Sequence, residues 1–197
     1  MAKAQPKYAS RWTDELVQLT DCQLRANVSP DSFGQTTDGR WDLRGFVLRG
    51  IYRNVSLVDL DLSYCRTEFA GQLLNCQISN VKFSRGVLKT NLDGAFVDCD
   101  FDSANLTRGL FRGSFICCSF RAANLKHSTG KSVVFENCDF KSANLLGSHL
   151  CSCQFKQCDW NEAKFGNGSF YRSKFFGSTP DNLDNTIMDL AEFTNGP

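Results

Sequence analysis

The stretch CDFDSANL at residues 99–106 returns three times with small changes, as CSFRAANL at 118–125, CDFKSANL at 138–145 and CDWNEAKF at 158–165. Successive copies begin 19, 20 and 20 residues apart. Self-similarity at a fixed period of this length is typical of solenoids, in which each repeat stacks on the next. The chain is therefore interpreted first as a repeat protein.

A shorter period of five residues lies inside the longer one. Starting at Phe115, every fifth residue up to Phe175 is large and apolar except Gly130. The residue two places before each of these is small except at Val133. The remaining three positions of each five are mostly polar or charged. One large and one small residue per unit are therefore expected to point inward.

Neither a regular helix nor a flat strand can use this pattern. A period of five spreads the apolar positions around a helix, and in a strand it switches them between faces. A chain that turns a corner every five residues keeps both inward positions inside, and four corners close a coil of about 20 residues. Such coils use nearly every backbone N–H for pairing, which excludes proline from the stack. The only prolines are Pro6, Pro30, Pro180 and Pro197.

The run resembles the pentapeptide-repeat family, whose pattern is a small residue, Asn or Asp, Leu or Phe, then two polar residues. Ala104-Asn105-Leu106, Ala123-Asn124-Leu125 and Ala143-Asn144-Leu145 match this pattern letter for letter. The resemblance covers residues 41–177, with two isolated units at 17–24. It implies an all-β fold, a right-handed quadrilateral parallel β-helix. About seven coils, roughly 33 Å tall, are expected for residues 41–177. The alternative is chance Phe periodicity in a β-sandwich.

The rest of the chain is expected to cap this solenoid. Residues 1–16 form an N-terminal cap, and 17–177 form the β-helix, with a loop at about 26–40 that is rich in turn formers. Residues 178–197 form a C-terminal cap. Thr179-Pro180 favours a helix start there, and Leu183, Ile187 and Leu190 then form one apolar stripe. The stripe serves either as a lid on the last coil or as a homodimer interface.

The five-residue period slips at two places. Phe111 and Phe120 are nine residues apart rather than ten, which places a missing residue near Phe115-Ile116. Leu88 and Phe96 are eight residues apart, with Leu92 at the corner between them.

Composition places the chain among soluble, cytoplasmic proteins. It has 197 residues, a formal charge of +1 and ten cysteines. The N-terminus lacks the apolar core of a signal peptide, and no run is long enough to span a membrane, so reduced thiols are expected. An acid-free basic start leaves an organellar transit peptide as the alternative. Cys99, Cys118, Cys138 and Cys158 are expected to form one buried, reduced ladder.

The sequence carries no signature of catalysis or of a cofactor. His127 and His149 fall on outward positions without a motif beside them, and no phosphate loop or nucleophile motif occurs. Cys151, Cys153 and Cys158 do not have the paired spacing of a zinc site, so no metal is expected. The chain is therefore predicted not to be an enzyme.

The family resemblance implies a binding protein. Several bacterial members bind type II topoisomerases and protect them from quinolones or peptide toxins, so DNA gyrase or topoisomerase IV is the implied partner. A rigid scaffold or docking protein for an unrelated partner is the alternative. Neither nucleic acid nor a membrane is expected as a partner. A homodimer that forms through the C-terminal segment is expected.

Two groups of residues are the candidate sites. The loop and one locally acidic wall form the candidate protein-binding surface, and the C-terminal stripe forms the candidate dimer interface. Residues 41–177 carry a net charge of +5, which argues against a simple mimic of DNA. The protein-binding candidates are Asp31, Phe33, Asp100, Asp102, Asp139, Asp159 and Glu162. The dimer candidates are Leu183, Ile187 and Leu190.

Overall fold

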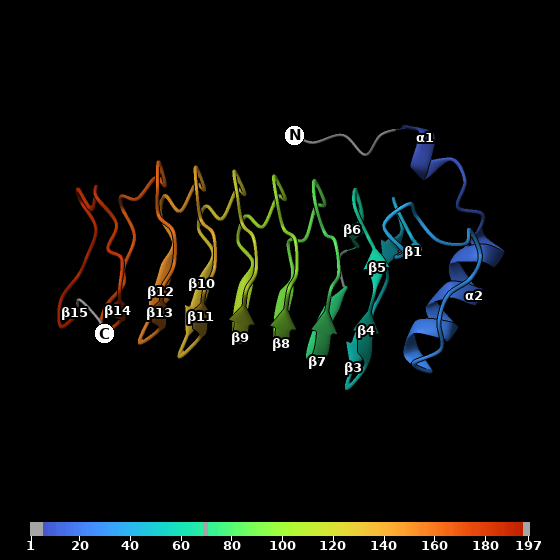
Figure 1. Cartoon of the computed structure of the whole chain (residues 1–197), viewed down its shortest axis with the longest axis horizontal. Coiled ribbons are helices and arrows are strands. Elements are labelled where there is room, and N and C mark those ends of the chain that lie inside the picture. Colours follow the sequence, from blue (N-terminus) through green and yellow to red (C-terminus); the bar gives the residue numbers. More distant parts are fainter. Residues whose placement is uncertain (1–5, 69–70, 195–197) are drawn as a thin grey trace.

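A computed structural model describes residues 6–68 and 71–194 and confirms the solenoid predicted from the period of five. Figure 1 shows coils stacked along the long axis, with the helices α1 (Pro6–Ala9) and α2 (Asp14–Arg25) at one end and β15 (Glu192–Thr194) at the other. Every pairing between named strands is parallel. The other strands are β1 (Trp41–Asp42), β2 (Val47–Leu48), β3 (Ile51–Arg53), β4 (Ser56–Val58), β5 (Leu60–Asp61), β6 (Arg66–Thr67), β7 (Gln72–Ser79), β8 (Asn91–Val97), β9 (Leu110–Ile116), β10 (Thr129–Lys131), β11 (Val134–Glu136), β12 (His149–Cys151), β13 (Gln154–Lys156) and β14 (Lys174–Phe176).

Each coil has four sides, and each side contributes one inward column of large residues. We number the sides along the chain by the columns that contain Phe101 (side 1), Leu106 (side 2), Phe111 (side 3) and Phe115 (side 4). Strand pairing carries the side 4 column through eight coils, seven of them within residues 41–177. Its members are Leu57, Ile78, Phe96, Phe115, Phe135, Phe155, Phe175 and Phe193.

Stacked aromatic rings fill the interior. Phe120 is fully buried, and its ring lies 4.9 Å from Phe101 below and 4.9 Å from Phe140 above, nearly parallel to both. Since the coil repeat sets the ring spacing, like side chains pack on like along each column. Gly130 interrupts side 3 between Phe111 and Leu150.

The small residue and the Asn or Asp of each unit have structural roles. The Asn or Asp side chain accepts a hydrogen bond from the backbone N–H two residues later, as in Asn105 to Thr107 and Asp139 to Lys141. This bond stabilises the corner, as in an Asx turn. The Cys138 thiol donates to the carbonyl of Phe115 in the coil before, at 3.2 Å. The small inward residue can thus bond to a carbonyl of the coil before it.

The cysteine ladder has the expected location. Cys99, Cys118, Cys138 and Cys158 are at most 2% exposed, and none forms a disulfide. Their side chains occupy the small inward position at the start of side 1.

We expect Cys138→Phe to lower the free energy of unfolding by about 1–3 kcal/mol, because a ring cannot fit between Cys118 and Cys158 without overpacking. Cys138→Ala should lower it by only about 1 kcal/mol, since it removes one sulfur atom. Urea denaturation of both variants measures the difference. Equal stability of the Phe variant and the wild type would contradict inward placement.

Two predictions about the ends of the solenoid are wrong. Residues 17–24 are not repeats but part of α2, whose residues Val17, Thr20 and Leu24 are buried against the first coil. The oxygen of Thr13 caps this helix by accepting from the Leu16 N–H. The cap therefore extends beyond residue 16, and pairing within the stack begins at Trp41.

The C-terminal segment is not a helix, and its described part forms an eighth coil. Leu183, Met188 and Phe193 keep the five-residue period. The Phe170 N–H donates to the Ile187 carbonyl, and β14 pairs with β15. A helix would satisfy its own backbone and leave these edge groups of the seventh coil unpaired, so the coil is the better solution.

One residue is missing at the corner between sides 3 and 4 in both the third and the fourth coils, and the third coil lacks a second residue between Leu88 on side 2 and Leu92 on side 3. Leu92 takes the side 3 column as expected, paired with Leu73 and Phe111. The residue missing from the fourth coil, predicted near Phe115-Ile116, lies just before Phe115, between Phe111 and Phe115, because both phenylalanines keep their columns.

Candidate binding surfaces

Side 1 brings most of the predicted acidic residues together. Asp100, Ser119, Asp139 and Asp159 lie in register on four successive coils, so their side chains form one outward column about 4.8 Å apart per coil. Each aspartate accepts the N–H two residues later, at 2.7 Å for Asp100, 2.8 Å for Asp139 and 2.8 Å for Asp159. The carboxylates are therefore held in fixed orientations by the turns that they cap.

Asp102 and Glu162 flank this column. Asp102 accepts from the Ser119 hydroxyl at 2.5 Å and from the Arg121 N–H at 3.1 Å. Burial raises the pKa of Asp102 above its usual value, despite the hydrogen bond from Ser119. Glu162 accepts from the Ser142 hydroxyl at 2.5 Å. The arrangement can present fixed negative charge.

The loop residues Asp31 and Phe33 lie apart from this column, on the N-terminal cap. Phe33 packs edge-on against Trp12, with ring centroids 4.9 Å apart, and the Arg11 guanidinium lies 4.1 Å from its centroid. Asp31 is exposed and accepts from the Gln23 amide at 3.3 Å. Phe33 thus holds the loop to the cap rather than projecting from it.

The far part of the loop is tied to the solenoid. Asp38 pairs with Lys82 of the third coil at 2.5 Å, and the Arg40 guanidinium donates to the backbone and side chain of Asn80. The hydrogen bond from Lys82 is the main cause that lowers the pKa of Asp38 well below its usual value. A cavity of about 540 Å³ lies beside these residues, between the loop and side 1.

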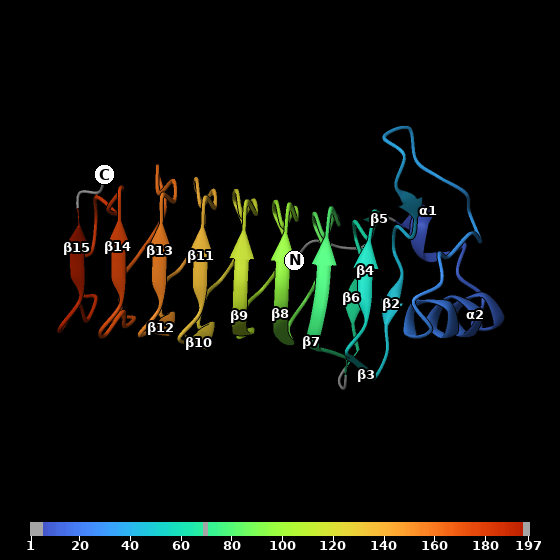
Figure 2. The same cartoon turned by 60° about the horizontal axis from the view of Figure 1, so that its bottom comes forward.

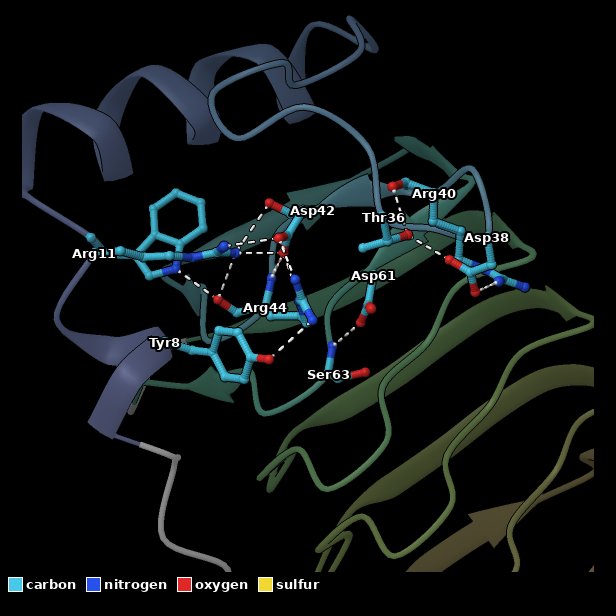
Figure 3. Close-up of polar contacts among 10 residues, drawn as sticks. Tyr8, Arg11, Thr36, Asp38, Arg40, Asp42, Arg44, Asp61 and Ser63 are labelled. Atoms are coloured by element: carbon cyan, nitrogen blue, oxygen red, sulfur yellow. Dashed lines mark hydrogen bonds and ion pairs between the residues drawn. The ribbon is translucent and has the colours of Figure 1, made fainter.

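Asp42 lies at the centre of a latch that joins the cap to the first coil (Figure 3). Arg11 donates to Asp42 at 2.7 Å, and Arg44 donates at 2.6 Å. The Trp12 indole N–H donates to the Arg44 carbonyl at 3.0 Å, and Arg44 reaches the Tyr8 hydroxyl at 3.0 Å. Burial alone would raise the pKa of Asp42, but the hydrogen bonds from Arg44 and Arg11 together lower it well below its usual value.

We expect Asp42→Asn to lower the free energy of unfolding by about 2–3 kcal/mol at pH 7, because it leaves two partly buried guanidinium groups without their carboxylate. The folded-state pKa of Asp42 is below the unfolded value of about 3.9, so its stabilisation is complete above about pH 4 and is lost as pH falls toward the folded-state pKa. The gap between variant and wild type should therefore shrink at pH 3. Asp159→Asn is the control, since an asparagine still caps its turn. Urea denaturation at both pH values checks this, and a gap that widens in acid would contradict it.

A groove of about 500 Å³ follows the corner between sides 3 and 4. In later coils this corner includes a residue with positive φ, such as Ser132 or Ser152. In the third and fourth coils one residue is missing from the corner, and Gly94 and Gly113 form the turn. A Cβ on Gly94 would lie 2.0 Å from the Cys76 carbonyl oxygen, and one on Gly113 would lie 2.1 Å from the Gly94 oxygen. Only glycine permits coils this close. The lining combines Asn, Ser and Gln side chains and Asp93 with small or apolar residues.

The C-terminal end is the other unusual surface. Among the described residues, no strand pairs with the outer edge of β15, which lies at one end of the stack (Figure 2). Ile187, Leu190 and Phe193 are 53%, 63% and 46% exposed, whereas Leu183 is partly buried against the core. Two of the three predicted dimer residues are thus exposed together on the last coil, with Phe193 beside them.

The remaining candidates for chemistry lie apart from one another. His127 and His149 are both exposed. Burial raises the pKa of Cys65, and it raises that of Cys153 to about 12, so these thiols are poor nucleophiles at neutral pH. Within residues 6–68 and 71–194, no three His, Cys, Asp or Glu side chains are placed to hold a metal ion. In the same residues no helix is long and apolar enough to cross a membrane.

Sequence reasoning missed the latch and the groove. The latch joins Arg11 to Asp42, and no local pattern marks such a pair. The groove did leave a signal, because Gly94 and Gly113 each stand where one residue is missing from the period.

No family model and no curated protein match this chain. Solved structures do. A trypsin-treated variant of QnrB1, a plasmid-mediated fluoroquinolone resistance protein, is 15% identical over 76% of this chain and 92% of its own, with a TM-score of 0.37. Full-length QnrB1 is 14% identical over 76% and 94%, with a TM-score of 0.22. A pentapeptide repeat protein, Rfr23, from the cyanobacterium Cyanothece 51142 is 12% identical over 74% and 90%, with a TM-score of 0.24. At these values no function follows from the likeness.

Proposed function

We propose that this chain, a four-sided parallel β-helix, is a non-catalytic protein that docks a protein partner along side 1, and that the partner is a type II topoisomerase such as DNA gyrase. The observation that carries the proposal is the column of fixed carboxylates, Asp100, Asp139 and Asp159, flanked by Asp102 and Glu162. A surface that binds DNA attracts regularly spaced, rigid negative charge. The resemblance of the repeat pattern to topoisomerase-binding pentapeptide-repeat proteins supports the choice of partner.

The structure offers a variant that removes the charge and keeps the turns. In the triple variant Asp100→Asn, Asp139→Asn, Asp159→Asn, each amide oxygen can still accept the N–H that the carboxylate accepts. The control Asp59→Asn, Asp93→Asn, Glu136→Gln removes three negative charges outside side 1. Equal melting temperatures would show that both variants fold.

The experiment is a gyrase pull-down followed by a supercoiling assay with and without a quinolone. The wild type and the control should bind gyrase and restore supercoiling in the presence of the drug, and the side 1 variant should bind at least tenfold more weakly. Failure of the wild type to bind gyrase and topoisomerase IV would reject the proposed partner. In that case the alternative function is that of a rigid scaffold that docks an unrelated protein.

We propose further that two copies associate through the C-terminal coil. Ile187, Leu190 and Phe193 are the exposed apolar side chains of that coil, and β15 leaves an unpaired strand edge. A twofold pair would bury both features.

We expect the double variant Ile187→Asp, Leu190→Asp to be a monomer at tens of micromolar, where the wild type is a dimer, because each dimer would bury four unpaired charges. Sedimentation velocity measures both species. The control Leu19→Asp changes an equally exposed leucine at the other end and should remain a dimer. A wild type that sediments as a monomer would contradict the dimer, and the C-terminal coil would then only cover the end of the seventh coil.

A further inference from the structure

Charge is divided between the sides of the solenoid. On sides 2 and 3, counting each corner residue with the side that precedes it, residues 41–177 place ten basic and two acidic side chains. Side 2 carries Arg49, Arg66, Lys89, Arg108, Lys126 and Lys164 against Glu68. Side 3 carries Arg53, Arg112, Lys131 and Arg172 against Asp93. Sides 1 and 4 carry the other seven basic and ten acidic side chains. The net charge of the chain is therefore small because a basic half, sides 2 and 3, offsets an acidic half, sides 1 and 4.

The two halves also differ in ion pairing. On sides 1 and 4, five of the seven basic residues have a carboxylate within 4.0 Å, for example Arg121 with Asp139 and Lys156 with Glu136. On sides 2 and 3, Arg49 alone among the ten has such a partner in the described residues. Nine cations on one half of the molecule thus have no carboxylate within 4.0 Å in the part of the chain that the structure describes.

The densest part of the basic half covers the third to fifth coils. Arg112 and Lys131 are in register on adjacent coils, about 4.8 Å apart along the stack. Arg108 lies at the corner just before Arg112, and Lys89 and Lys126 lie on the flanking coils of side 2. All of these except the half-buried Lys126 are exposed.

We propose that sides 2 and 3, over the third to fifth coils, bind the phosphate backbone of a nucleic acid. A nucleic acid presents a dense row of negative charge, about one per 1.7 Å of duplex axis, so cations repeated about every 4.8 Å along the stack can each contact a phosphate. A membrane surface fits less well. Among the described residues from Asp59 to Thr186, no large hydrophobic side chain is exposed for insertion. The surface offers no element that enters a groove, so recognition is of the backbone and not of base sequence.

The probe is a fluorescein-labelled 20-base-pair DNA duplex, and its fluorescence anisotropy is measured with the full chain at several salt concentrations. We expect binding at low salt, with a slope of log K against log salt of about −3 to −5, one phosphate for each cation in contact. The variant Arg108→Gln, Arg112→Gln, Lys131→Gln should bind at least tenfold more weakly and with a slope smaller by about two to three.

The control variant is Arg121→Gln, Lys141→Gln, Lys174→Gln, which removes the same charge from sides 1 and 4 and should bind like the wild type. Equal melting temperatures would confirm folding. The proposal is overturned if the duplex does not bind at low salt, or if both variants weaken binding equally. It is also overturned if polyglutamate or anionic vesicles bind more tightly than the duplex, since these would identify an acidic protein or a membrane as the occupant. This test does not involve a topoisomerase, so it is independent of the proposed function.

Discussion

Gly113→Ala should lower the free energy of unfolding by about 2–5 kcal/mol. The φ angle of Gly113 is +87°, a conformation that costs about 1–2 kcal/mol with a side chain present. The new Cβ would also lie 2.1 Å from the backbone oxygen of Gly94, and separating two paired coils adds a further cost of about 1–3 kcal/mol. Thermal or urea denaturation measures the sum.

Gly39→Ala separates the two causes. Gly39 has a similar φ angle of +81°, but no atom lies within 4 Å of its Cβ position. It should therefore show only the conformational cost, about 1 kcal/mol. If the two variants lost equal stability, close contact between the coils would not be the reason for glycine at the groove.

Phe120→Ala should lower the free energy of unfolding by about 3–5 kcal/mol. Phe120 is fully buried at the middle of the stack, and its ring also packs near Phe111, Phe115 and Phe135. The cavity cannot collapse easily, because the backbone ladder fixes the distance between coils. Urea denaturation is the measurement.

Phe176→Ala is the matched control. Phe176 follows the inward Phe175 on β14 and is only partly buried on the outside of side 4. Its loss should lower stability by about 1 kcal/mol. A similar loss for both variants would mean that the phenylalanine columns do not form the core.

The five-residue period predicted the inward columns because each unit repeats the same local solution: a small residue, a turn-capping Asn or Asp, and a large apolar residue. The same period could have predicted the last coil, since Leu183, Met188 and Phe193 follow it. The helical spacing of Leu183, Ile187 and Leu190 competed with it. Pairing with the seventh coil, a tertiary contact, decides between them.

The N-terminal cap was harder to predict. In α2, Val17, Thr20 and Leu24 have the spacing of one helix face. The same segment also fits the pattern of two five-residue repeats, with small or inward positions at Val17 and Cys22 and large ones at Leu19 and Leu24. The choice between helix and repeat depends on how the end of the solenoid is covered. The first coil has no neighbour, so its apolar edge must be covered by another element. The latch at Asp42 links residues 31 positions apart, and no local propensity encodes it.

The side on which a surface residue lies is set by counting along the chain. Because each corner takes about five residues, an insertion of five within the stack would turn everything that follows by a quarter of a revolution, and each inward position would still lie over an inward position. Downstream cations would then leave sides 2 and 3 together and occupy a different direction. An insertion of a whole coil would instead lengthen the rod and leave every direction unchanged. Surface patterns on such a molecule can therefore be redirected during evolution by duplicating short segments, without changing a single side chain.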